Sequence, residues 1–238
     1  MSWVCIPTRG IGSWRDRLAR PDRQWRRGHS AFEAAVSWEL AAKRRPSGLP
    51  QPIEEWFIGC GLNGPVLALA IAEHKVKVGG RGGDSQCDVW ALVRSEADFI
   101  SVAVEAKALE PFGSETLEAW LSSGKSERSP ANRRRRWESL RAYLPALGSF
   151  NGVQFQLLHR CAGAVIEAKR LRLRQAACII QSFRNCPENI SAYERFCRAI
   201  DTNWNAGCTI RSSVDGIALL IGWVDCALAT DKDVAACV

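Results

Sequence analysis

The chain has 238 residues, with 32 Lys and Arg against 25 Asp and Glu, a net charge of +7 and an isoelectric point near 9.0. This length is enough for a sizeable core and predicts a single domain over residues 1–238. The mild basic excess fits a polyanionic partner without requiring one. No apolar run reaches the roughly 18 residues of a membrane span, and the amino-terminal stretch lacks the apolar region of a signal peptide. The ten cysteines have no zinc-binding spacing, so we expect reduced thiols and a cytoplasmic protein.

The first long helix is expected at Ser30–Arg44, after an irregular segment, residues 1–28, that proline and glycine interrupt. Ser30 and Glu33 have the spacing of a capping box, in which two side chains satisfy backbone N–H groups at the start of a helix. Glu39 instead falls on the apolar stripe, where a carboxylate costs free energy unless it is paired. Glu39 is therefore either a functional acid or the partner of a nearby Arg or Lys.

A loop at Arg44–Pro52 and a short buried strand at Val66–Ala72 are expected next. Glu73 and His74 follow this strand. They could add an acid and a base to a site, but the pattern favours a solvated strand end. The glycine-rich run at 79–83 lacks the Lys-Ser or Lys-Thr ending of a P-loop, so we expect no nucleotide cradle there.

A β-hairpin is predicted from two alternating, Val- and Ile-rich strands, Gln86–Arg94 and Phe99–Ala108. The polar tetrapeptide Ser95-Glu96-Ala97-Asp98 joins them. If these four residues form the hairpin loop, Arg94 lies opposite Phe99, and that one pair sets the register of the whole hairpin.

Two carboxylates and an ammonium group converge on one face of this hairpin. The register places Asp88 opposite Glu105, and the alternation of side chains puts Lys107 on the same face. One interpretation is a structural charge cluster in which Lys107 neutralises both acids. The other is a metal site, because carboxylate oxygens suit Mg²⁺ or Mn²⁺; the Ala106 carbonyl could add a ligand and Lys107 could orient a water. The tripeptide Glu-Ala-Lys recurs at 167–169, but in a predicted helix, where residues two apart do not face each other.

The arrangement of Asp88, sixteen further residues and then Glu105-Ala106-Lys107 on the next strand resembles the PD-(D/E)XK nuclease superfamily. Cys87 stands where that pattern often has a proline, which is its looser part. The surrounding phrases are also similar to an uncharacterised group of microbial nuclease-like proteins: GGDSQCDVWALV, VAVEAKALEPFG and FQLLHRCAGAVIEA. The resemblance implies a restriction-endonuclease-like αβββαβ core with Mg²⁺ or Mn²⁺ chemistry, and it defines no substrate.

The resemblance also assigns roles to residues outside the hairpin. The first helix of the superfamily often carries an acid that reaches the metal, and Glu39 matches this role better than Glu33. Several of its families place a glutamine near the metal on the helix after the third strand, and Gln156 matches it. The implied site is therefore Asp88, Glu105, Lys107, Glu39 and Gln156, with the backbone of Ala106 as a further metal ligand.

A basic helical region follows the hairpin, with helices predicted at Ser114–Leu121 and Ala131–Leu144. Four successive arginines in the second helix point in different directions, so only one or two can meet a phosphate backbone. We expect nucleic acid to contact Arg133 and Arg134, and more weakly Lys125 in the preceding loop.

The rest of the chain predicts two more helices and two more strands, at Gln154–Leu173, Ala176–Phe183, Ile190–Ile200 and Ile217–Asp225. The order helix, three strands, helix, strand predicts an α/β domain with a central mixed sheet flanked by helices. Its core would span about residues 30–183, and residues 184–238 would form a carboxy-terminal α/β extension.

Three functional hypotheses follow. The first is Mg²⁺- or Mn²⁺-dependent hydrolysis of phosphodiester bonds in nucleic acid, DNA before RNA. The second is an inactive relative that binds nucleic acid or a protein. The third is a metal-dependent enzyme acting on another phosphate in a narrow pocket. Intact Asp88, Glu105 and Lys107 favour activity over the second hypothesis, and the sequence contains no evident helix-turn-helix or zinc finger that would define a target.

Overall fold

The structure is a computed structural model that describes residues 8–79, 83–96, 98–113, 115–123, 128–145 and 148–237. One six-stranded sheet has the order β1-β2-β3-β4-β6-β5. The strands are β1 (Val66–Val76), β2 (Ser85–Arg94), β3 (Phe99–Lys107), β4 (Gln175–Ser182), β5 (Ile210–Val214) and β6 (Ile217–Asp225). β1, β2 and β3 pair antiparallel, β3, β4 and β6 pair parallel, and β5 returns antiparallel to β6. The protein is thus an α/β domain with an open mixed sheet, as the sequence predicts.

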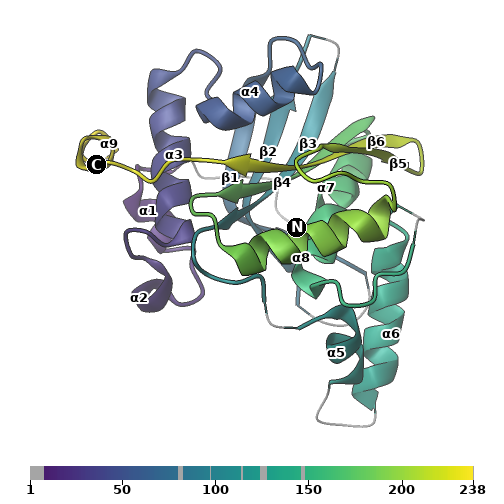
Figure 1. Ribbon diagram of the computed structural model, residues 1–238. Coiled ribbons are helices and arrows are strands. Elements are labelled where there is room, and N and C mark those ends of the chain that lie inside the picture. The colour runs from purple at the N-terminus through teal and green to yellow at the C-terminus, as the bar shows by residue number, and fades with distance from the viewer. Residues whose placement is uncertain are drawn as a thin grey trace.

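Helices cover both faces of this sheet (Figure 1). They are α1 (Gly12–Arg15), α2 (Pro21–Gln24), α3 (Ser30–Arg44), α4 (Gln51–Gly59), α5 (Leu117–Ser122), α6 (Arg128–Arg141), α7 (Phe155–Arg170), α8 (Pro187–Ile200) and α9 (Asp231–Ala235). α3 and α4 pack on one face, whereas α7 lies across the other and α8 packs against α7. α5 and α6 project from the body of the protein as an arm. Within the described residues, no helix is long and apolar enough to cross a membrane.

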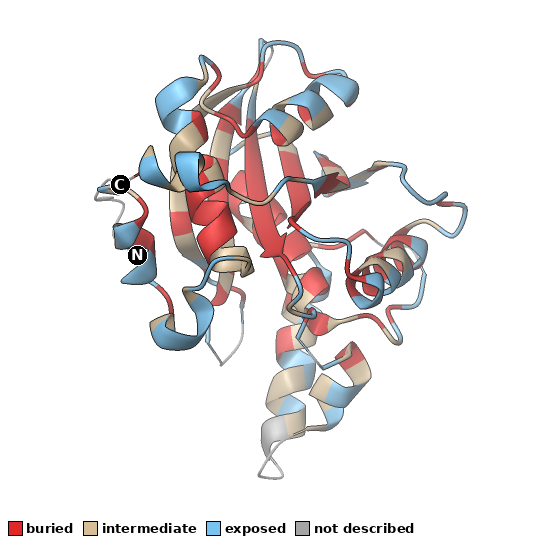
Figure 2. Cartoon of the chain, turned by 60° about the vertical axis from the view of Figure 1, so that its left-hand side comes forward, coloured by how far each residue is buried: buried red, intermediate tan, exposed pale blue. Residues whose placement is uncertain are grey.

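The central strand β3 is buried on both sides because helices cover both faces of the sheet at this point. Eight consecutive residues, from Ile100 to Lys107, are buried. Val102 and Val104 pack towards α3 and α4, and Ala103 packs towards α7. Figure 2 shows the central strands buried along most of their length, while the α5–α6 arm is largely intermediate or exposed. Any charged side chain near the end of β3 is therefore removed from solvent.

The helix predicted at Ser30–Arg44 is confirmed with those bounds as α3. Its apolar stripe, including Phe32 and Val36, is buried. The helix ends at Arg44 because the next residue precedes Pro46, and a residue before proline avoids the helical conformation. Arg45 accordingly has the extended angles φ −108° and ψ 136°.

The predicted capping box at the start of α3 is wrong. The N-cap residue is His29, and its side chain makes no capping hydrogen bond. The Glu33 carboxylate instead accepts the backbone N–H groups of Gly28 and Ala229, each at 2.7 Å. Glu33 is thus a buried tie between the segment before α3 and the carboxy-terminal segment, and this contact between distant parts of the chain has no local signature.

The predicted hairpin register is confirmed, since Arg94 lies opposite Phe99 and Val89 opposite Val104. Three further expectations are corrected. α4 occupies part of the chain for which no element was predicted, β1 continues to Val76, and the region expected to be irregular contains the one-turn helices α1 and α2. In the segment expected to be a carboxy-terminal extension, β6 pairs directly with β4 and continues the central sheet.

Candidate active site

The site lies where β2 begins and β3 ends. Regular pairing between these strands stops at Val89 and Val104, and the Asp88 side chain replaces the next backbone contact. Its Oδ2 accepts the N–H of Ala106 at 2.7 Å. Asp88 and Glu105 both line a cavity of about 490 Å³. The hairpin therefore brings the two predicted carboxylates to one cavity, and the backbone of Ala106 lies between them.

Glu105 is 1% exposed, and both of its carboxylate oxygens are hydrogen-bonded. Oε1 accepts from Lys107 Nζ at 2.6 Å and from Gln156 Nε2 at 2.6 Å. Oε2 accepts from Nε of Arg160 on α7. The Gln156 amide is fixed in turn because its Oε1 accepts the N–H of Gly113 at 2.9 Å. Donors from β3 and from α7 thus meet at the Glu105 carboxylate. Lys107 and Gln156 both lie beside the predicted acid.

Glu73 is a third carboxylate at this site, from β1. Ala72 lies opposite Val89 and His74 opposite Cys87, so Glu73 is across from Asp88 on the neighbouring strand. It lines the same cavity, and its Oε2 accepts from Gln86 Nε2 at 2.5 Å. Its φ of 54° is in the left-handed region, which costs a residue other than glycine about 1–3 kcal/mol. This backbone conformation twists β1 locally. The Glu73 side chain faces the site, whereas the sequence pattern favoured a solvated strand end.

The three carboxylates titrate differently because, among the described residues, Lys107 and Arg160 form their ion pairs with Glu105. Burial alone would raise the pKa of Glu105, but Arg160 and Lys107 outweigh it and lower this pKa to about 2. Burial and the negative charges of Glu105 and Glu73 raise the pKa of Asp88 well above its usual range. Burial also raises the pKa of Glu73 to about 7, with a smaller contribution from Glu105. The site therefore combines one carboxylate that is held ionised with two whose ionisation is disfavoured, in a cavity that Arg23 and Glu110 also line.

The other predicted site residues lie elsewhere. Glu39 does not line the cavity; its Oε1 accepts from Nε1 of Trp14 at 2.8 Å. The start of α3 borders the cavity, but Glu39 is about 13 Å farther along this helix at 1.5 Å per residue. The alternative expectation was that Glu39 pairs with a nearby Arg or Lys. Among the described residues its hydrogen-bond partner is instead the indole of Trp14.

The arginines of α6 have different roles from one another. Arg133 lies over the ring of Trp120, 5.3 Å from its centroid, and donates to the carbonyl of Trp120 and to Ser123 Oγ. Arg133 therefore helps to hold α5 against α6. Arg134 is exposed, as the nucleic-acid prediction requires. Lys125 lies outside the described residues.

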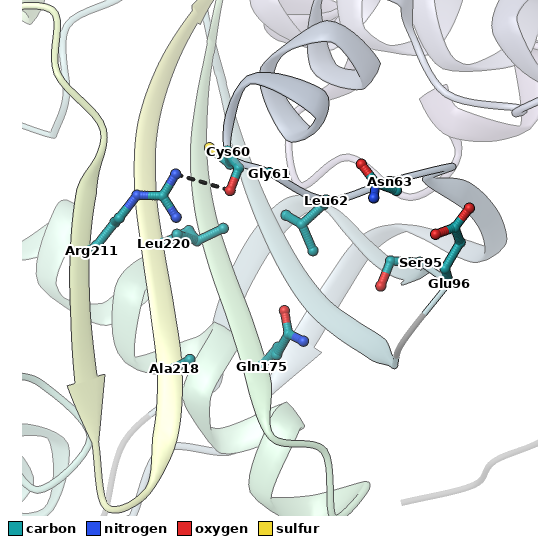
Figure 3. A pocket seen from close by; sticks show the side chains of 10 residues that line it. All are labelled: Cys60, Gly61, Leu62, Asn63, Ser95, Glu96, Gln175, Arg211, Ala218 and Leu220. Atoms are coloured by element: carbon teal, nitrogen blue, oxygen red, sulfur yellow. Dashed lines mark hydrogen bonds between the residues drawn. The ribbon is translucent and has the colours of Figure 1, made fainter.

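A second cavity, of about 300 Å³, lies near the opposite ends of β2 and β3 (Figure 3). Its lining has one acid, Glu96, and one cation, Arg211. Arg211 Nη2 donates to the carbonyl oxygen of Cys60 at 2.9 Å. This cavity lacks the combination of opposed carboxylates and buried cations, so the candidate chemistry belongs to the cavity at Asp88 and Glu105.

The donor atoms fit a magnesium or manganese ion of the common kind, held by one or two carboxylates together with water and substrate oxygens. Within the described residues, no three His, Cys, Asp or Glu side chains form a ready-made metal-binding group. Asp88 and Glu105 nevertheless offer hard oxygens to one cavity. A carboxylate has about four lone-pair positions, and the three donors on Glu105 leave one, on Oε2. A divalent cation there would also favour the ionised form of Asp88, whose pKa is raised by burial and by the neighbouring carboxylates.

Comparison with known proteins gives a family for the chain. A family model described as "Domain of unknown function (DUF6946)" matches residues 7–227. The chain belongs to this family. No curated protein and no solved structure matches it. The family description names no activity or ligand, so the functional argument rests on the site itself.

Two residues of the site were not selected from the sequence. Arg160 is not among the predicted site residues, yet it lies four residues after Gln156, a spacing that places both on one helix face. Glu73 follows a buried strand, and its position opposite Asp88 required the β1–β2 register. The first had a usable local signal, whereas the second depended on pairing between strands.

The raised pKa of Glu73 predicts a pH-dependent stability in metal-free protein. Folding raises this pKa from 4.5 to about 7, so the folded state holds the proton more tightly than the unfolded chain. The contribution of Glu73 to the unfolding free energy therefore falls as the pH rises from about 4.5 to above 7, by up to about 3 kcal/mol. Glu73→Gln keeps a neutral group throughout. Denaturant unfolding with a chelator should show the stability of wild type minus that of Glu73→Gln decreasing between pH 5 and about 8; parallel curves would contradict the assignment.

Proposed function

We propose that the protein is a metal-dependent phosphodiesterase that acts on nucleic acid, DNA before RNA. The observation that carries this proposal is the meeting of Asp88 and Glu105 at one cavity, with Lys107 and Gln156 beside them. Two carboxylates, a lysine and a glutamine in this spatial arrangement suit the binding of a hard cation next to a phosphate.

The order of the elements supports the same proposal. α3, β1, β2, β3, α7 and β4 follow the helix, three strands, helix, strand of the PD-(D/E)XK superfamily, with α4 between α3 and β1, and α5 and α6 between β3 and α7, as additions. β1 to β3 form an antiparallel meander, and β4 pairs parallel to β3 after the α7 crossover. We therefore propose that the core is of the restriction-endonuclease type.

The residues would divide the work as follows. Bound Mg²⁺ or Mn²⁺ would lower the pKa of a water and offset negative charge on the phosphate. Asp88 and Glu105 would hold the cation, and the Ala106 carbonyl would add a further ligand. Lys107, which is 6% exposed and fixed by Glu105, would orient the attacking water and offset developing charge. Glu73, which lines the cavity, takes the place of Glu39 as the third carboxylate.

The exposed face of α6 supports a polyanionic substrate. Arg134 and Arg135 are exposed on the arm, and Arg133 and Arg136 are used internally, since Arg136 donates to the carbonyl of Gly83. A loop that leads to β2 is thereby attached to the arm. We propose that the exposed pair contacts the phosphate backbone and that Arg133 acts through the arm's structure.

One observation favours the alternative of an inactive, nucleic-acid- or protein-binding relative. Lys107 and Arg160 already compensate the charge of Glu105 without a metal. In that case the cluster is structural, and the ammonium serves as a counter-ion. Catalysis and structural compensation differ in what the loss of Lys107 does.

Lys107→Met should reduce cleavage of DNA by about 100-fold or more while leaving Mn²⁺ binding largely intact, because its charge acts mainly in the transition state. Methionine keeps the length and the apolar stem, so the packing loss should be small. The measurement is a nuclease assay on supercoiled, linear and single-stranded DNA in Mg²⁺ or Mn²⁺. Lys232→Met, at an exposed position of α9, is the matched loss of a lysine.

The contrary result is equally specific. A wild type that cleaves none of these substrates, together with a Lys107→Met protein that melts earlier and is restored by metal, would make Lys107 a structural counter-ion. The function would then pass to the binding alternative.

Replacing Arg134 and Arg135 with glutamine should weaken duplex binding and make its salt dependence shallower. Each phosphate contact contributes a slope of about −0.9, so the double variant should shift the slope by up to about 2. The measurement is the dissociation constant over a range of salt concentrations. Arg174→Gln, at an exposed arginine just before β4, is the control and should leave the slope unchanged. An equal slope in wild type and the double variant would remove the arm from the nucleic-acid surface.

A further inference from the structure

Arg160 is an unusual component of the site because its guanidinium group is buried and held from several directions. The residue is 8% exposed. Its Nε donates to Glu105 Oε2, and its Nη1 lies 3.0 Å from Ser85 Oγ and 3.0 Å from His159 Nδ1. Ser85 Oγ is itself 2.8 Å from His159 Nδ1. This network fixes Arg160 behind Glu105, so its role is to position that carboxylate.

The position of Arg160 limits what else Glu105 can bind. Lys107 and Gln156 donate to Oε1, whereas Arg160 is the one donor to Oε2 among the residues that the structure describes. An incoming divalent cation must therefore share Oε2 with a guanidinium group. Arginine remains protonated at any physiological pH, so this positive charge cannot be removed by proton loss. Two positive charges that meet on one carboxylate repel each other strongly in a buried environment.

We propose that Arg160 is the built-in counter-ion of Glu105, which holds the carboxylate in place without metal and keeps divalent-cation binding weak. This inference rests on the proposed function, since it concerns the same metal site. The buried carboxylate needs a compensating charge in the free protein, and Arg160 supplies it at the expense of metal affinity. Metal occupancy would then be set by a residue that is not itself a metal ligand.

The test is Mn²⁺ binding to Arg160→Gln, measured by calorimetry at neutral pH in the absence of nucleic acid. The glutamine amide can still donate to Glu105, and Lys107 continues to compensate its charge, so the variant is expected to fold with a lower melting temperature. Loss of the positive charge should tighten Mn²⁺ binding by about tenfold or more. Arg160→Lys is the matched control, because it keeps the charge; its affinity should lie closer to that of wild type than to that of Arg160→Gln.

Circular dichroism establishes whether the variant is folded. If the variant is unfolded without metal, it is titrated with Mn²⁺. Recovery of the helical signal at a Mn²⁺ concentration at or below the wild-type dissociation constant supports the inference. No recovery at about ten times that concentration contradicts it. If the wild type binds Mn²⁺ and the folded Arg160→Gln variant binds it no more tightly, this inference is overturned and the proposed function still stands. Absence of binding to both proteins overturns the metal site, and this inference with it.

Discussion

Charge compensation of one buried carboxylate organises the functional end of this protein. Glu105 lies near the end of a strand that helices cover on both faces, and an unpaired carboxylate there would cost several kcal/mol. Lys107 from the same strand and Arg160 from α7 compensate it. Their charges also act on Asp88, and that of Arg160 on Glu73, but burial and the neighbouring carboxylates outweigh them there and raise both pKa values. The site thus contains one carboxylate that stays ionised and two carboxyl groups with raised pKa values. A bound divalent cation would favour the ionised form of these two groups.

The fold produces this cluster through three separate constraints. The hairpin register brings Asp88 to the end of β3, where its side chain accepts a hydrogen bond from the N–H of Ala106. The parallel crossover places α7 over the same end of the sheet, so that its first turns deliver Gln156 and Arg160 to Glu105. The left-handed residue Glu73 adds a carboxylate from β1. Loss of any one constraint would leave part of the cluster without its partners.

The sequence predicts the parts of this site that depend on local spacing. The four-residue loop set the hairpin register, and with it the approach of Asp88 to Glu105 and Lys107, because strand alternation is a short-range rule. The bounds of α3 agree with the predicted helix, although the capping box expected at its start is absent. Hydrophobic periodicity did not predict the contacts that join distant segments of the chain. Glu33 binds backbone near Ala229, and Glu39 meets Trp14, and neither partner could be found from residues nearby in the chain.

The same distinction explains the cationic residues. Four adjacent arginines in α6 were expected to point in different directions, and Arg133 and Arg134 do differ in exposure. Which of them remains exposed depends on how α5 packs against α6, with Trp120 beneath the guanidinium group of Arg133. Arg160 has an ordinary sequence context, and only the crossover of α7 over β3 gives it a buried carboxylate to hold.

The central claim is that Asp88 and Glu105 form one cation site, and calorimetry with Asp88→Asn tests it most directly. Asparagine retains a carbonyl oxygen for the N–H of Ala106, so the hairpin end should persist while the charge is lost. The account predicts saturable Mn²⁺ binding to the wild type and its loss, or a weakening of about tenfold or more, in Asp88→Asn with an unchanged fold. Equal binding heats for the two folded proteins, or no binding to the wild type at millimolar Mn²⁺, would contradict it.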